Sequence, residues 1–250
     1  MDEGILDVYN KSIDLNTNRI NEGLAENKID LATVYQNKGR ALINFERYEE
    51  AIKDFTRAIE IYDDMKSNNQ EFNIKDLAEA YQNRGKAYSY SDKHWNAIKD
   101  FSETIKISEE NNLDKRILSE NYRDRGMSFM EIEKPQKAIE NYRKSIEIYK
   151  KLLEEQQEID FNQYSALFMS EGITLLMLKK YQEAIMSLNQ AYDIQKNLYD
   201  KGDLLDIPVI VTTLRSRIVA NTKLNNLIEV NRDENLIKEF GQAFNRLRNQ

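Results

Sequence analysis

The side chains that could carry out chemistry are few and poorly placed for it. Acid and base catalysis uses two carboxyl groups at one reacting bond, and three pairs of adjacent carboxylates suggest it. These pairs are Asp63 with Asp64, Glu109 with Glu110, and Glu154 with Glu155. Because neighbouring residues on a helix point about 100° apart, each pair is expected to be solvated charge near the end of a helix.

Metal binding and nucleophilic catalysis lack the residues that they need. His94 is the only histidine and cysteine is absent, so neither a second imidazole nor a thiolate can complete a transition-metal site. The sequence has no glycine-rich phosphate loop and no nucleophile elbow. We therefore expect no enzymatic activity, no metal and no cofactor, and we interpret His94 as surface packing in a turn beside Trp95.

Charge and hydropathy exclude two further classes of protein. The 36 basic and 43 acidic residues give a net charge of −7, and the two signs are interspersed. Nucleic-acid binding needs a basic face to neutralise phosphates, so no nucleic-acid partner is expected. No segment approaches the roughly 18 apolar residues of a membrane span, and the first residues do not form a signal peptide. These features predict a soluble, cytoplasmic protein without a membrane span.

A motif that occurs four times, each copy centred on a glycine, predicts the helices that carry the candidate side chains. The glycines are Gly39, Gly85, Gly126 and Gly172, at spacings of 46, 41 and 46 residues. Four aligned columns accompany them: an aromatic residue four before, alanine twelve after, a large apolar residue sixteen after, and a small residue nineteen after. The first copy contributes Tyr35, Ala51, Phe55 and Ala58 to these columns. A chain that repeats in this way predicts a solenoid, because one helix pair cannot bury its apolar face alone.

Capping residues predict where the helices begin. Asn27, Asn73, Asp114, Asp160 and Asp206 share the period of the glycines, and their side chains can accept from the free N–H groups of a first helical turn. Second helices are expected after short polar turns that end at Tyr48, His94, Pro135 and Tyr181. We predict one domain over residues 1–250, made of a half-repeat 1–26, repeats 27–72, 73–113, 114–159 and 160–205, and a capping pair 206–250.

The glycine, aromatic, alanine and small-residue columns resemble the tetratricopeptide repeat family over residues 27 to about 200. The run Asn83, Arg84, Gly85 is similar to a common bacterial form. Each repeat exceeds the family's 34-residue unit by about a dozen residues, and the usual proline of the second helix is missing. Both departures are explained if the second helix continues for two or three more turns. Such lengthened repeats resemble those of kinesin light chains and bacterial peptide-sensing regulators. The resemblance implies an all-α solenoid that winds as a right-handed superhelix of antiparallel helix pairs.

The resemblance also implies a concave groove lined by the first helix of each pair. In the first two repeats the implied partner-binding residues are Gln36, Asn37, Arg40, Gln82, Asn83 and Lys86. In the next two they are Arg123, Asp124, Met127, Met169, Ile173 and Met177. Amides can bind a peptide backbone, cations can bind a carboxylate, and methionine adapts to apolar side chains.

Three functions stay open on these residues. The first is a scaffold that binds a peptide or protein partner in the groove. The second is a sensor that responds to a peptide or small ligand, and the third is a homo-oligomer formed through the N-terminal half-repeat, whose first helix is missing. Alternatively, the polar half of the groove is ordinary helix surface, and residues 207–247 cover its apolar half.

Overall fold

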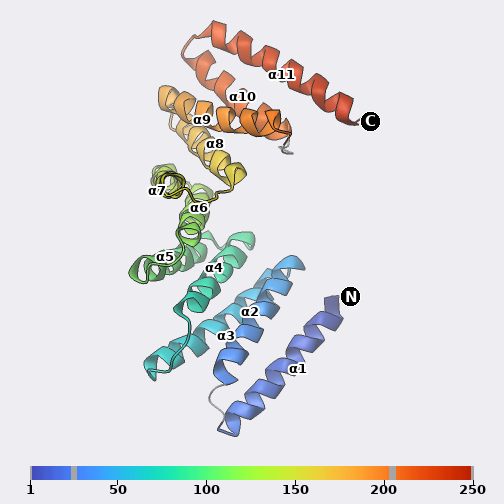
Figure 1. Ribbon diagram of the computed structural model, residues 1–250, viewed down its shortest axis with the longest axis vertical. Helices are drawn as coiled ribbons and strands as arrows, with labels where there is room; N and C mark the ends of the chain where they lie inside the picture. The colour runs from blue at the N-terminus through green and yellow to red at the C-terminus, as the bar shows by residue number, and fades with distance from the viewer. Residues whose placement is uncertain (1, 24–26, 203–206, 249–250) are drawn as a thin grey trace. The chain divides into compact units, whose positions relative to one another are not determined.

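The computed structural model describes residues 2–23, 27–202 and 207–248. Over these ranges the protein forms eleven helices and no strand (Figure 1). The helices are α1 (Asp2–Asn21), α2 (Asn27–Asn44), α3 (Tyr48–Ser67), α4 (Ile74–Tyr90), α5 (His94–Glu110), α6 (Lys115–Glu131), α7 (Pro135–Glu154), α8 (Phe161–Met177), α9 (Tyr181–Asp200), α10 (Ile207–Lys223) and α11 (Leu227–Arg248). The expected starts of the four second helices are confirmed at the first residues of α3, α5, α7 and α9.

Three of the predicted capping residues are confirmed by their hydrogen bonds. The Asn73 side chain accepts from the Lys75 backbone N–H at 3.1 Å, and Asp114 and Asp160 accept from the N–H groups two residues further on, each at 2.8 Å. The helix α2 begins at Asn27 itself, and Asp206 lies outside the described residues. Local capping chemistry therefore sets the beginnings of α4, α6 and α8.

The turn within each helix pair has one shape. Its second residue lies in the left-handed region, with φ between 56° and 59° at Glu46, Asp92, Lys179 and Asn225. The following N–H donates back to a carbonyl five residues earlier, as Arg47 does to Leu42 at 2.8 Å. This bond closes the end of the first helix and reverses the chain.

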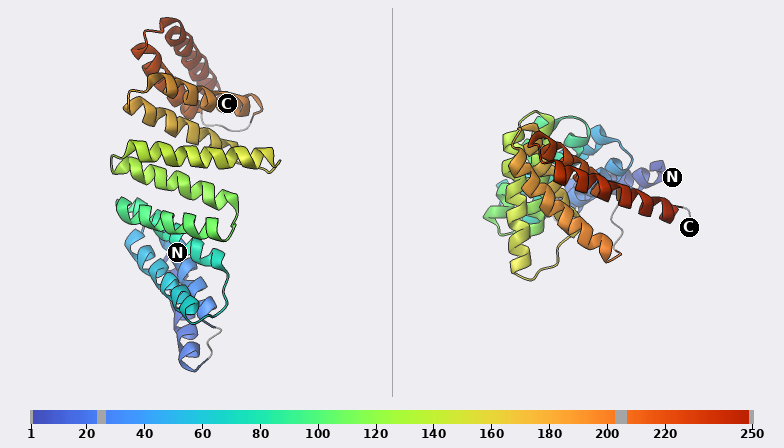
Figure 2. Two further views of the ribbon diagram at one scale, coloured as in Figure 1. Left: turned by 90° about the vertical axis from the view of Figure 1, so that its left-hand side faces the viewer. Right: turned by 90° about the horizontal axis from the view of Figure 1, so that it is seen from above.

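The protein forms two compact units, Met1–Ile132 and Glu133–Gln250. In the first unit α1 to α6 pack in chain order, and the first helix α4 also contacts the first helices α2 and α6 on either side of it. In the second unit α7 to α11 pack in chain order, and α8 also contacts α10. Figure 2 shows these helices lying alongside their neighbours. The predicted all-α solenoid of stacked helix pairs is thus confirmed in each unit. The assignment of residues 1–250 to one domain, with the repeat bounds given above, stays a prediction.

The recurring glycines let the two helices of a pair approach closely. A Cβ atom on Gly39 would lie 2.8 Å from the Phe55 ring, and one on Gly85 would lie 2.8 Å from the Phe101 ring. A Cβ on Gly172 would lie 2.6 Å from Leu188. Since real Cβ contacts are longer than 3.0 Å, these positions have room only for hydrogen. The sequence spacing of sixteen residues is therefore a direct contact between the helices of one pair.

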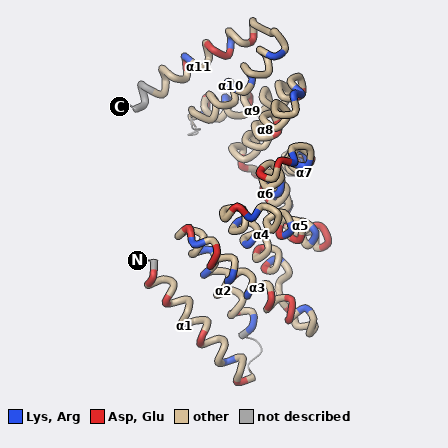
Figure 3. The backbone as a smooth tube through the Cα atoms, turned by 180° about the vertical axis from the view of Figure 1, so that it is seen from behind, with Lys and Arg blue, Asp and Glu red and all other residues tan. Residues whose placement is uncertain are grey.

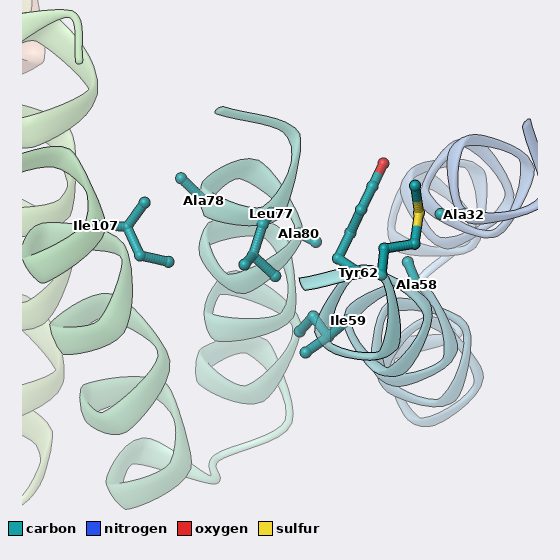
Figure 4. Packing of buried hydrophobic residues seen from close by; sticks show 9 residues of the cluster. Ala32, Ala58, Ile59, Tyr62, Leu77, Ala78, Ala80 and Ile107 are labelled. Atoms are coloured by element: carbon teal, nitrogen blue, oxygen red, sulfur yellow. The ribbon is translucent and has the colours of Figure 1, made fainter. Parts of the chain in front are cut away.

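Small residues and aliphatic side chains fill the space between successive pairs. Figure 4 shows Ile59 and Tyr62 of α3 facing Leu77 and Ala80 of α4. Ala32, Ala58, Ala78 and Ile107 complete this buried cluster. Each pair thus buries apolar surface against the next one, which a single pair cannot do.

The second helices are longer where the repeat is longer. The helices α3, α7 and α9 have 20 residues each, and they continue without a break through Asp63, Lys150 and Lys196, where the family has proline. The helix α5, in the 41-residue repeat, has 17 residues. The shorter repeat has therefore lost about one turn at the end of its second helix.

Candidate functional site

Two of the implied groove amides are used inside the fold. Gln36 is buried, and its side-chain amide donates to the Tyr62 hydroxyl at 3.0 Å and to the Asp76 carbonyl at 3.3 Å. Burial also raises the pKa of the Tyr62 phenol. Gln82 is buried as well and donates to Glu120 at 3.0 Å. Both amides join neighbouring repeats, so neither is free to hold a partner's backbone.

The polar residues next to them remain accessible. Arg40 is exposed, donates to the side-chain oxygen Oδ1 of Asn37, and lies 3.9 Å from Glu79. Asn83 is half-buried on α4. The cation of Arg40 can therefore meet a ligand, although Glu79 offsets part of its charge.

Four implied groove residues line one hollow of about 290 Å³ in the first unit. We call it the α4–α6 hollow. Its lining is Lys86, Ser89 and Tyr90 from α4, Phe101 from α5, and Arg123, Asp124 and Met127 from α6. The register of the repeat thus brings residues 37 positions or more apart in the sequence to one place on the protein surface.

The α4–α6 hollow combines one uncompensated cation with apolar walls. Arg123 Nε donates to Asp124 Oδ1 at 2.9 Å, so these two charges offset each other. Lys86 lines the hollow, and no ion pair of Lys86 is found among the described residues. Tyr90 is 57% exposed and Met127 is 51% exposed. The hollow therefore suits a carboxylate that lies beside an apolar group.

A neighbouring aromatic ring extends the apolar wall. The Tyr48 ring at the start of α3 lies 5.4 Å from the Tyr90 ring, measured between centroids and tilted by 38°. Aromatic pairs at this distance are attractive, so Tyr48 supports the position of Tyr90. Phe101 and Tyr48 were not among the implied site residues, because their columns were interpreted as core and turn.

The implied residues of the fourth repeat lie on α8 in the second unit. Met169 and Ile173 are half-buried, whereas Met177 is 62% exposed. The helix α10 packs beside α8, and α11 packs on α10. The C-terminal pair therefore leaves the Met177 end of α8 uncovered. Figure 3 shows that α8 carries little charge, with Glu171 as its single charged residue, whereas α2 to α5 carry both signs.

A column of buried and half-buried polar contacts between the helices of a pair was not predicted from the sequence. In three pairs the residue just before the glycine position contacts the residue sixteen places later: Lys38 with Asp54 at 3.3 Å, Arg84 with Asp100 at 2.7 Å, and Arg217 with Asp233 at 2.7 Å. Arg84 also donates to Thr56 of the preceding pair at 3.1 Å. The signal was present as opposite charges at a constant spacing of sixteen.

The column changes polarity in the fourth repeat. There the acid lies on the first helix: Glu171 accepts from Ser187 at 2.9 Å and from Arg143 of α7 at 2.5 Å. Glu171 is buried, and it is satisfied by donors from both sides. Each such contact ties a first helix to second helices, which favours one register of packing.

The other candidate groups do not assemble into a reactive centre within the described ranges. His94 is half-buried at the start of α5, with Nε2 3.8 Å from the exposed Asp92 carboxylate. Asp64 pairs with Lys28 at 2.6 Å on the surface. In the described part of the chain, no group of three His, Cys, Asp or Glu residues could hold a metal ion, and no helix has the length and hydropathy to cross a membrane.

Fold and site together define a class, the all-α repeat proteins in which each two-helix unit stacks on the next. A sequence model of the tetratricopeptide repeat matches residues 32–65, with Gly39 as its eighth residue. The other glycine copies share the columns of that unit, and Gly85 and Gly172 make the same close contact as Gly39. The chain is accordingly a tetratricopeptide-repeat protein, with lengthened repeats. No curated protein matches it by sequence.

Solved structures share the fold at low sequence identity. BtubC (BKLC) from P. vanneervenii matches with a TM-score of 0.75 and 15% identity, over 98% of this chain and 92% of that one. YrrB, described as a tetratricopeptide-repeat protein with an unusual peptide-binding site, matches with a TM-score of 0.60 and 15% identity, over 88% and 91%. The signal-transduction ATPase PH0952 from Pyrococcus horikoshii, which has a tetratricopeptide-repeat sensor, matches with a TM-score of 0.70 and 15% identity, over 93% of this chain and 35% of that one.

Proposed function

We propose that this protein is a non-enzymatic, cytoplasmic scaffold that binds a segment of a protein or peptide partner. The observation that carries the proposal is the α4–α6 hollow, where the Lys86 ammonium lies beside the exposed Tyr90 and Met127. Such a surface suits an acidic residue next to a large apolar one in the partner. The peptide-binding site named for YrrB, a protein of the same fold, supports the proposal.

Two further surfaces extend the proposed contact within their own units. In the first unit, Arg40 and Asn37 on α2 offer a cation and an amide to polar parts of a partner. In the second unit, Met169, Ile173 and Met177 on α8 offer an apolar strip, where flexible thioethers adapt to varied side chains. A peptide-responsive regulator would use the same residues, so the titration described next detects its ligand too.

The test is a binding titration with peptides that carry an acidic residue beside Phe, Leu or Tyr, compared with versions in which the acid is an amide. We expect Lys86→Ala and Met127→Ala each to weaken binding by about tenfold, since one lost charged or apolar anchor costs about 1.4 kcal/mol. Arg57→Ala is the matched control, because Arg57 is exposed on α3 and pairs only with Glu60 among the described residues. Unchanged affinity in both hollow variants would reject the hollow as the site.

We propose homo-oligomerisation through α1 as a second function, and a specific observation favours it. One face of α1 packs on α2 through the buried Leu6, while the other face exposes Ile5, Val8 and Leu15. Val8 alone is 65% exposed. An exposed apolar helix face of this kind suits a second copy of the chain. Light scattering over a concentration series tests it: native protein should associate and Val8→Lys should not, whereas a native monomer at every concentration would end the proposal.

A further inference from the structure

We propose that the second unit has another docking surface, formed where the ends of α7 and α9 meet the start of α8, and that it binds a basic amphipathic segment of a partner protein. We call this surface the α7–α9 edge. It consists of Leu153, Ile159, Phe161, Ile194 and Leu198, with Glu158, Asp193 and Lys201 at its rim. It shares no residue with the α4–α6 hollow, so it goes beyond the function proposed above.

Phe161 joins two hollows on this edge. It is the first residue of α8, where the Asp160 side chain caps the helix and fixes its backbone. On one side it lines a hollow of about 390 Å³ with Leu153 and Ile159. On the other side it lines a hollow of about 400 Å³ with Ile194 and Leu198. Both volumes lie at the low end of the roughly 300–1,000 Å³ of ligand pockets, which suits one or two aliphatic side chains each.

The first of these hollows is made entirely of residues that the tetratricopeptide repeat does not contain. The family unit matched at 32–65 has Gly39 as its eighth residue. In the same register, the units around Gly126 and Gly172 span 119–152 and 165–198. Every residue that lines the hollow, from Leu153 to Phe161, falls in the extra stretch between them. The first hollow of the α7–α9 edge is therefore a product of the repeat extension.

The repeat architecture does not require apolar residues at these positions. In register with Phe161 the first repeat has Lys28, which is bound to Asp64, and in register with Leu153 it has Lys66. Where the same column is apolar, Ile74 of α4 is half-buried against the core and Ile207 of α10 is buried. Phe161 instead remains 43% exposed, and Leu153 is exposed beside it. Adjacent large apolar side chains that a protein leaves in water mark an interaction surface.

The charges at the rim select the partner. Glu158 borders the first hollow, and Asp193 and Lys201 border the second. Neither Glu158 nor Asp193 forms an ion pair within the described ranges of the chain. Two carboxylates against one ammonium favour a partner that brings Lys or Arg beside its apolar residues. A helix with two apolar anchors on one face and basic residues flanking them meets both requirements.

The test uses the full chain and two synthetic 14-residue helical peptides of the same pattern, one built from Leu and Lys and one from Leu and Gln. We expect the Leu/Lys peptide to bind and the Leu/Gln peptide, which has no charge for the rim carboxylates, to bind at least tenfold more weakly. Phe161→Lys places the first repeat's residue at this position and should weaken Leu/Lys binding at least tenfold. The double change Glu158→Lys with Asp193→Lys should weaken it by a similar factor, and it keeps the test valid if Phe161→Lys fails to fold. Arg57→Ala, at an exposed position on α3 that belongs to neither surface, is the control and should leave the affinity unchanged.

Three results would overturn the proposal. The first is no binding of the Leu/Lys peptide to the native protein, or equal binding of both peptides. The second is an affinity that survives both sets of changes at the edge. The third is a native dimer in sedimentation equilibrium that Phe161→Lys dissociates, since this would make a second copy the occupant. Loss of acidic-peptide binding at Lys86 would bear on the proposed function alone.

Discussion

Replacement of Gly85 by alanine tests the close contact that organises each helix pair. The new Cβ would lie 2.8, 3.0 and 3.2 Å from three carbons of the Phe101 ring, whereas carbon atoms pack best at about 3.5–4.0 Å. The ring is almost fully buried and rigid, so it or the whole of α5 must move by roughly 0.5–1 Å. Overpacking of this kind costs about 1–3 kcal/mol, while alanine gains about 1 kcal/mol over glycine inside a helix.

The clash should exceed the gain in helix propensity, so Gly85→Ala should lose about 1 kcal/mol of stability. Gly241 in α11 is the matched control, because a Cβ there meets no atom within 4 Å. Gly241→Ala should gain up to about 1 kcal/mol from propensity alone. Urea unfolding followed by circular dichroism measures both variants. Our explanation of the glycine column is wrong if Gly85→Ala proves as stable as Gly241→Ala.

Three more predictions concern single contacts. Glu46→Gly should stabilise the protein by about 1 kcal/mol in a urea titration, because Glu46 has φ 58° and glycine adopts that region without strain, whereas Glu46→Ala should bring no such gain. Arg84→Ala should cost about 3–5 kcal/mol by leaving Asp100 buried without its partner, and the double variant Arg84→Met with Asp100→Leu should recover most of that loss. Burial raises the pKa of Asp54 in the folded protein above its ordinary 3.8, and Lys38 opposes part of this shift. At a pH between the ordinary pKa and the raised pKa of the folded state, folding therefore takes up a proton. The stability of the native protein relative to Asp54→Asn should therefore increase as the pH falls through that window, and a difference that stays constant from pH 7 to pH 4 would show that Asp54 titrates normally.

The helix pairs could be predicted from the sequence because their determinants are local. A glycine, an alanine twelve later and a capping residue such as Asn73 act through contacts within one pair, and the register copies them along the chain. Helix register gives the face of the helix on which a residue lies, but it does not give how deeply neighbouring repeats bury that residue. Gln36 lies on the expected face and yet is buried, because Tyr62 of its own pair and Asp76 of the next pair both reach its amide.

The α4–α6 hollow was predictable in part for the same reason. Lys86 and Met127 follow from the register of the first helices. Phe101 has a column of its own, and its ring was assigned to the core because it packs on Gly85. One side chain can do both, since its ring packs on Gly85 and also lines the hollow. Sequence periodicity assigns each residue either to the core or to the surface, so it misses a residue such as Phe101 that contributes to both.

The reversed polarity at Glu171 limits how the modules of this protein can be rearranged. A chimera in which the first helix of the second repeat replaced α8 would bring the equivalent of Arg84 against Arg143, so two guanidinium groups would meet where an acid and a base now do. Each repeat therefore matches the neighbour that it has. The order of the repeats is constrained by buried polar side chains that do not contact a ligand.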